Sequence, residues 1–465
     1  MDKKRLDRFL RNKIKVYDVN DERVIDKKHF ETLVTNDYID TIHEVIENIV
    51  DRYPNRYISK DAFNKLGVSE IYDPESYERL TDVDYFVDKN GGYTLKNFLY
   101  LRTLSFLSFI DPSVTRDTLE HEKTSSIGCY SYAESGNYNF NINIAESMLY
   151  NAVAIRHIKN KDIDLNRFLK VKSDEHDNNE FVRVINGSIS DNNMESELRY
   201  FYSAMRFFSI NLFSNRIDDS DKVKIQKDYK NERKHSFAHE FLHALKLDKV
   251  YTLNKQNNYY FANNSGFTDL KTKENFKANI DDGKKFINKN ALLFDEVIND
   301  LHSLKYTGLE DECRKEVVYY TDKDYYYKQN KLETHSGYSD CLDLAEMVEI
   351  LYGEETLFLS SILYRQQLLE SLDKRYEKFF KNNALLRKQF KEQAFVNIDN
   401  LSLFEIIGTS FRLINEAKSN KNIVLPLKMS MQNSLLKAID YKLTYKEDRE
   451  YLLGIYSKLK NSLLK

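Results

Sequence analysis

The stretch KHSFAHEFLHAL, residues 234–245, combines an apolar pattern with two histidines and a glutamate. Its apolar residues recur at the spacing of one helix face: Phe237, Ala238, Phe241, Leu242 and Leu245. His239 and His243 lie on the border of this stripe, four residues apart, so a helix projects both side chains from one face. We therefore predict a helix over 233–247 that packs on a core and presents both histidines to a cleft.

The same stretch contains the pattern H-E-x-x-H. Two imidazoles one helical turn apart can bind one zinc ion at about 2.0 to 2.1 Å. In this pattern the glutamate, here Glu240, is not a ligand; it accepts a proton from the attacking water and passes it to the leaving group. With 10 histidines in the chain, the pattern arises by accident in about one chain in fifty of this composition. A third ligand is therefore needed. His235 we interpret as a residue that supports a ligand or lies at the surface.

Two arrangements for a third ligand can be compared with the sequence. The extended metzincin pattern requires Gly and His at positions occupied here by Lys246 and Lys249, which excludes that class. The other arrangement takes a glutamate from a later helix. The segment LLFDEVINDLHSL, residues 292–304, has helical periodicity and places Glu296 and Asp300 four residues apart on one face.

HEFLH followed by EVIND resembles the gluzincin metalloproteases of the thermolysin type. The resemblance implies that Glu296 is the third ligand of one zinc ion per chain and that Asp300 orients His239. A carboxylate on the distal ring nitrogen fixes the tautomer of a ligand histidine and raises its basicity, which agrees with this role. The order of SGF (265–267), LFDEVINDL (293–301) and SGYSDCLDLAEMVEILYGEE (336–355) is also similar to zincin-like proteins of Gram-positive bacteria.

The resemblance covers about residues 235–360 and has departures. About 52 residues separate His243 from Glu296, more than the shortest spacing in the family, so an insertion must fold away from the site. Glu296 has the alternative of a solvated helix carboxylate, with Glu346 or Glu349 as the ligand in its place. Asp295 is interpreted as a surface charge.

A hydrolase of this kind also needs a donor to the developing oxyanion. His335 and Tyr338, in the segment THSGYSD, are the two candidates, because members of the family place a histidine or a tyrosine near this point. We favour Tyr338, since a phenol with a pKa near 10 stays protonated at neutral pH. We also expect a strand before the HEFLH helix to pair with an extended peptide substrate.

The composition of the chain argues against several other classes of protein. Charged residues make up 31% of the chain with a net charge of only −3, so no basic field indicates a nucleic-acid partner. The first thirty residues lack the apolar run of a secretory signal, and no segment is apolar for the roughly 18 residues of a membrane span. Three widely spaced cysteines suggest neither a disulfide framework nor a thiolate metal site. We expect a cytoplasmic protein without membrane contact, with export by a route that needs no N-terminal signal left open.

The fold class that we predict is α+β and predominantly helical. A chain of 465 residues exceeds one compact core of roughly 150 residues. We expect an N-terminal helical lobe (1–110), a zincin-like catalytic domain with a small β-sheet (111–341) and a C-terminal helical bundle (342–465). Period-two alternation predicts a hairpin over 128–145 and further strands over 181–189 and 259–268, while helical periodicity covers 195–214 and 291–305.

The predicted function is a zinc metallopeptidase that hydrolyses peptide or protein substrates. The metal site consists of His239, His243 and Glu296, with Glu240 as the general base. One alternative is a zincin-derived binding or regulatory protein that keeps the metal without turnover. Another is a helical scaffold without metal. The intact Glu240 favours the enzyme.

Overall fold

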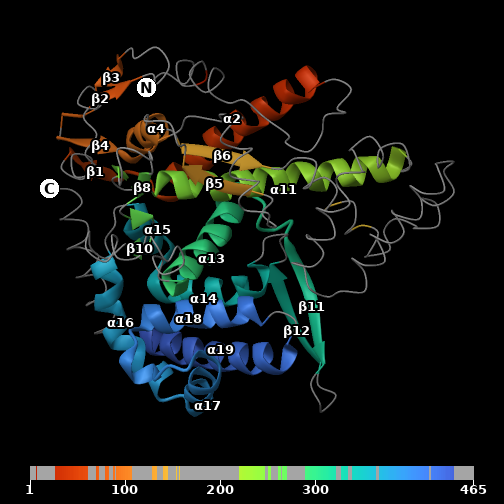
Figure 1. Ribbon diagram of the computed structural model, residues 1–465, viewed down its shortest axis with the longest axis vertical. Helices are drawn as coiled ribbons and strands as arrows, with labels where there is room; N and C mark the ends of the chain where they lie inside the picture. The colour runs from red at the N-terminus through yellow and green to blue at the C-terminus, as the bar shows by residue number, and fades with distance from the viewer. Residues whose placement is uncertain are drawn as a thin grey trace. The chain divides into compact units, whose positions relative to one another are not determined.

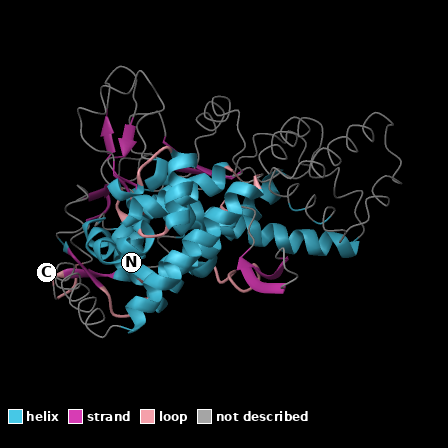
Figure 2. Ribbon diagram, turned by 90° about the horizontal axis from the view of Figure 1, so that it is seen from below, coloured by secondary structure: helices cyan, strands magenta, loops and turns pink. Residues whose placement is uncertain are grey.

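The computed structural model consists mainly of helices joined to short antiparallel strand pairs (Figure 2). It describes residues 7, 27–60, 70–72, 79–82, 87–89, 91–106, 128–132, 140–144, 153, 157, 219–246, 250–252, 260–262, 264–265, 267–269, 289–320, 326–332, 338–362, 366–417 and 420–444. This part of the chain is therefore α+β and predominantly helical, as predicted. The expected strand over 181–189 and helix over 195–214 lie outside the described residues.

Contacts between residues divide the chain into two compact units. The larger unit contains 46–106 and 242–465, and the smaller unit contains 2–45 and 107–241. The larger unit thus joins segments from all three of the consecutive domains expected from the sequence. The division passes through two continuous helices, α2 (Lys27–Arg52) and α11 (Asp219–Leu245).

The hairpin predicted over 128–145 is confirmed in the smaller unit. Strand β5 (Gly128–Tyr132) pairs with β6 (Phe140–Ile144) in antiparallel register, with Gly128 opposite Ile144. The intervening Glu134-Ser-Gly-Asn has the turn-forming residues that favour such a reversal.

The N-terminal part of the larger unit contains strands as well as helices. Helix α2 ends at Arg52, just before Tyr53 and Pro54. Two short antiparallel pairs and one helix follow it: β1 (Tyr57–Ser59) with β4 (Gly92–Thr94), β2 (Glu70–Tyr72) with β3 (Arg79–Asp82), and α4 (Leu95–Phe106). The strands have three or four residues each, too few for a clear alternation in the sequence.

The middle of the larger unit contains the helix that was predicted over 291–305. Helix α13 (Lys289–Tyr306) confirms the prediction over 291–305. The strand expected over 259–268 is divided between pairs of short strands: β7 (Val250–Thr252) with β8 (Tyr260–Ala262), and β9 (Asn264–Ser265) with β10 (Thr268–Asp269). A hairpin of two seven-residue strands follows α13, with β11 (Arg314–Tyr320) paired to β12 (Tyr326–Leu332), and it was not predicted from the sequence.

The described residues from Ser339 to Thr444 form a helical bundle in the larger unit (Figure 1), and residues 445–465 of the expected bundle lie outside the described residues. Its helices are η3 (Ser339–Cys341), α14 (Leu342–Tyr352), α15 (Glu354–Ile362), α16 (Gln366–Lys381), α17 (Ala384–Gln389), η4 (Phe390–Ala394), η5 (Ile398–Asn400), α18 (Leu403–Glu416) and α19 (Lys421–Thr444). Ser402 and Glu405 form a capping box that satisfies backbone N–H groups at the start of α18.

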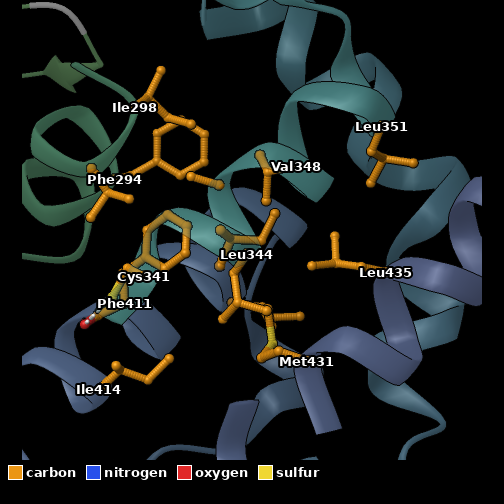
Figure 3. Packing of buried hydrophobic residues seen from close by; sticks show 14 of the residues in the cluster. Phe294, Ile298, Cys341, Leu344, Val348, Leu351, Phe411, Ile414, Met431 and Leu435 are labelled. Atoms are coloured by element: carbon orange, nitrogen blue, oxygen red, sulfur yellow. Dashed lines mark hydrogen bonds between the residues drawn. The ribbon is translucent and has the colours of Figure 1, made fainter. Parts of the chain in front are cut away.

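The bundle packs around α13 through a continuous apolar core (Figure 3). Phe294 and Ile298 of α13 lie in the same buried cluster as Leu344 of α14, Phe411 of α18 and Met431 of α19. The Phe294 ring also packs against Phe404 with centroids 4.5 Å apart, in a tilted geometry. Asp295 and Glu296 of α13 therefore follow directly on a residue of this buried cluster.

Helix α13 has a well-defined C-terminus. The N–H of Leu309 donates to the carbonyl of Leu304 (3.0 Å), and that of Gly308 donates to the carbonyl of Lys305 (3.3 Å). Gly308 has a φ of 68°, the left-handed conformation that this Schellman arrangement requires and that glycine adopts without a steric cost. The motif stops the helix and turns the chain toward β11.

The described helices are all too short or too polar to cross a membrane.

Candidate metal centre

Helix α11 carries both histidines of the H-E-x-x-H pattern. The apolar stripe predicted from the sequence is buried: Phe237, Ala238, Phe241, Leu242 and Leu245. His239, Glu240 and His243 on the border of this stripe are also buried, with 7%, 9% and 8% of their surface exposed. The helix continues without a break from Asp219 because residues 219–246 contain neither glycine nor proline. The two histidines therefore lie one helical turn apart on one continuous helix.

Helix α13 brings Glu296 to the second histidine. The Oε2 atom of Glu296 lies 3.2 Å from Nε2 of His243, and both residues belong to the larger unit. His239 is one turn earlier on the same continuous helix. One ligand atom from each of His239, His243 and Glu296 lies within 4.8 Å of the others. The structure thus brings together the three residues that the sequence predicted as metal ligands.

The donor set fits a divalent zinc ion. Two imidazoles and one carboxylate are the protein ligands of many catalytic zinc sites, which leave a fourth position open. Bond lengths of 2.0 to 2.2 Å imply that two ligand atoms on a tetrahedral ion lie about 3.4 Å apart. The 3.2 Å between Nε2 of His243 and Oε2 of Glu296 agrees with that spacing. The Glu296 side chain is 19% exposed, so the carboxylate is neither fully solvated nor sealed from solvent.

The interpretation of Asp295 as a surface charge is wrong. Its side chain is only 1% exposed, and its Oδ2 atom lies 3.3 Å from Nδ1 of His243. The other oxygen, Oδ1, accepts hydrogen bonds from Nζ of Lys246 (3.2 Å) and from the backbone N–H of Phe267 (3.4 Å). Lys246, one of the two residues that exclude the metzincin pattern, has no exposed surface. Sequence reasoning therefore missed both residues.

A weak signal for this pair was present in the sequence. Asp295 lies next to Phe294 and three residues before Ile298, at the edge of the apolar face of its helix. A charged residue at such a position is buried only when it has a partner. Nothing in the local sequence indicates that the partner is Lys246, which lies 49 residues earlier.

The charge of Asp295 is maintained by its neighbours. Burial raises the pKa of this carboxyl, but the positive charge of Lys246 and the contact with His243 outweigh burial and hold the pKa below its usual value. Asp295 is therefore an anion in the folded protein at neutral pH.

Asp300 and His235 are both buried. Asp300 lies on α13 one turn after Glu296 and has no exposed surface, and its predicted contact with His239 stays a prediction. His235 lies one turn before His239 and is 4% exposed, which rules out the surface alternative for it. Support of a ligand by His235 is still a prediction.

The two alternative third ligands have other partners. Glu346 accepts a hydrogen bond from Nη2 of Arg314 (2.6 Å). Glu349 accepts one from Lys305 and lies 3.2 Å from Nε2 of His302. Within the described ranges, three histidine and carboxylate side chains lie close enough together to hold an ion: His239, His243 and Glu296. The geometry thus favours Glu296 over Glu346 and Glu349.

One of the two candidate oxyanion donors lies within the described residues. Tyr338 lies at the turn before η3, where its carbonyl accepts a hydrogen bond from the N–H of Cys341 (2.8 Å), and its ring packs against the buried core. His335 lies outside the described residues. Neither role in catalysis is tested by these contacts.

Comparison with known proteins adds no relative: no family model, curated protein or solved structure matches the chain.

Proposed function

We propose that the protein is a zinc-dependent metallopeptidase with a gluzincin-type centre formed by His239, His243 and Glu296. The observation that supports this most directly is the convergence of these three side chains from two helices, with ligand atoms within 4.8 Å of one another. A zincin-like domain around α11 and α13 is part of the same proposal. The substrates that we propose are peptides or proteins.

Each residue of the centre has a separate task. His239, His243 and Glu296 hold the ion, which would polarise the scissile carbonyl and lower the pKa of a water molecule. Glu240 follows the first ligand on the same helix and is buried. Its carboxylate accepts a proton as water adds to the carbonyl carbon, and then delivers that proton to the amide nitrogen as the C–N bond breaks.

The tetrahedral oxyanion formed in this step needs a hydrogen-bond donor. Tyr338 is the donor that we propose, with His335 as the alternative. A phenol stays protonated and uncharged at neutral pH and can donate there. An imidazole, with an ordinary pKa near 6.5, changes its charge close to neutral pH, so it would act over a narrower pH range.

A peptide-library digest tests the function. The wild-type protein is incubated with the library alone, with a chelator, and with the chelator followed by excess zinc. We expect cleavage in the first sample, none in the second and recovery in the third. Cleavage at the same rate with and without the chelator contradicts the proposal. A protein that binds zinc and cleaves nothing instead supports the alternative of a binding or regulatory protein that keeps the metal.

A further inference from the structure

A chain of three buried polar side chains ends at the second candidate ligand. Lys246 contacts Asp295 at 3.2 Å, and Asp295 lies 3.3 Å from Nδ1 of His243. Lys246 has no exposed surface and the Asp295 side chain is 1% exposed. All three residues belong to the larger unit. The other ring nitrogen of His243, Nε2, lies near Glu296, so the two nitrogens of this imidazole have different partners.

The buried charges of this chain compensate each other. An isolated carboxylate in such an environment is costly to desolvate, and the nearby ammonium group of Lys246 offsets that cost. The Oδ1 atom of Asp295 also accepts a hydrogen bond from the N–H of Phe267 (3.4 Å). With Oδ1 occupied by Lys246 and Phe267, the second oxygen is directed at His243.

The end of α11 that carries His243 is also fixed by buried cations. Arg102 donates two hydrogen bonds to the carbonyl of Leu245, from Nη2 (2.9 Å) and Nε (3.2 Å), and has no exposed surface. Lys246 follows directly, and its N–H donates to the carbonyl of His243 (3.0 Å). Positive groups at a helix C-terminus interact favourably with the helix dipole and with its free carbonyls. The backbone that carries His243 is therefore anchored independently of its ring.

We infer that Asp295 is a positioning residue for His243 and that Lys246 is the buried counter-ion that holds Asp295 in this role. Asp295 accepts a hydrogen bond from Nδ1–H, which leaves the lone pair of Nε2 free for the ion that Glu296 would also bind. Lys246 cancels the charge of Asp295, so the centre gains a fixed ligand without a second uncompensated anion. This inference rests on the proposed metal centre, but the state of the Nδ1 atom can be measured without a metal.

The first test is the proton on Nδ1 in the metal-free protein. Nitrogen-15 NMR of labelled histidine should show Nδ1 of His243 protonated, with the proton protected from exchange with water. Asp295→Ala should lose that protection. A wild-type protein with an unprotonated Nδ1, or an Asp295→Ala protein with unchanged protection, overturns the inference whether or not zinc binds.

The second test separates positioning from folding through zinc affinity, measured by competition with a chelator. Loss of a group that orients a ligand typically costs about 10- to 100-fold in metal affinity. We expect such a loss in Asp295→Asn, because the remaining oxygen cannot serve both Lys246 and His243. The double variant Asp295→Ala/Lys246→Met removes both buried charges and the acceptor for Nδ1 of His243, so its melting temperature should recover relative to Lys246→Met while its zinc affinity stays low.

Two control variants carry the same chemical changes at exposed positions, Asp311→Asn and Lys230→Met. Both should match the wild type in affinity and stability. Wild-type zinc affinity in Asp295→Asn overturns the inference and leaves the proposed function intact. Failure of the wild-type protein to bind zinc counts against the proposed function, and the NMR measurement then decides the positioning role alone.

Discussion

The Nε2 atom of His243 lies 3.2 Å from the Oε2 atom of Glu296, although 53 positions separate the two residues in the sequence. Helix α11 supplies the buried histidine, and α13 supplies the glutamate, whose side chain is 19% exposed. The contact therefore depends on the tertiary fold and cannot follow from the local pattern alone. It is the feature on which the proposed metal centre depends.

Glu296→Gln should lose zinc while the protein stays folded. The substitution keeps the size of the side chain but removes the charged ligand, so we expect zinc affinity to fall by more than about 100-fold, beyond the typical effect of a group that only orients a ligand. Affinity is measured by chelator competition and folding by circular dichroism. Glu346→Gln is the matched control, because Glu346 pairs with Arg314. If Glu296→Gln binds zinc as tightly as the wild type, another residue is the third ligand.

Glu240→Gln should keep zinc and lose cleavage. An amide in place of the carboxylate cannot take a proton from water, and the loss of a general base typically slows a reaction by about 10² to 10⁴-fold. The rate on one substrate from the peptide library and the zinc content are measured on the same preparation. An unchanged rate would remove Glu240 from the mechanism.

The oxyanion donor is identified by comparing Tyr338→Phe with His335→Ala on one substrate. Loss of the donor should cost about 2.7 to 4 kcal/mol of transition-state stabilisation, seen in kcat and not in zinc content. We expect Tyr338→Phe to show this loss. A full-rate Tyr338→Phe beside a slow His335→Ala reverses the assignment, and two full-rate variants place the donor elsewhere in the chain.

A buried charge cluster in the larger unit should make the protein less stable in acid. Glu349 lies between Lys305 and His302 with 8% of its side chain exposed. Burial raises the pKa of Glu349, but His302 and Lys305 outweigh burial and hold it below its usual value of 4.5. Burial also lowers the pKa of His302 from 6.5. In both cases the unfolded chain binds protons more readily than the folded protein, so stability is lost as the pH falls.

The decline should begin below about pH 6.5 through His302 and steepen below about pH 4.5 through Glu349. Lys305 affects stability at alkaline pH. Its pKa is raised above the usual 10.5, so its contribution to the stability of the folded protein is lost only as the pH rises above that value. Denaturant unfolding across this range measures the effect. Glu349→Gln should cost about 3 kcal/mol at pH 7 and flatten the acid limb. An acid limb identical to that of the wild type would exclude Glu349 as its cause.

The sequence predicted the elements whose signal is local. Helices α11 and α13 carry apolar residues at helical spacing, and the hairpin of β5 and β6 has clear alternation. The start of α11 was placed at 233 and lies at Asp219, because the first half of the helix is mostly polar. In that half Ile225 and Tyr229 are buried, four residues apart, which is a weak periodic signal.

The contacts that depend on distant partners could not be predicted in the same way. Asp295 was interpreted as a surface charge because its partner Lys246 lies 49 residues away and follows a different helix. The same holds for Glu349, a candidate ligand in the sequence, whose partners His302 and Lys305 become its neighbours only when α13 packs on α14. In both cases tertiary packing decides whether a carboxylate is solvated, paired or available to an ion.

Metal analysis of the purified protein decides whether His243 helps to hold a zinc ion. The wild type, His243→Ala and the control His157→Ala, which removes a buried histidine that pairs with Asp228, are dialysed against trace zinc and measured by atomic emission. We expect one zinc ion per chain in the wild type and the control, and less than a tenth of that in His243→Ala. Equal zinc content in all three proteins, or no zinc in the wild type, would contradict this expectation.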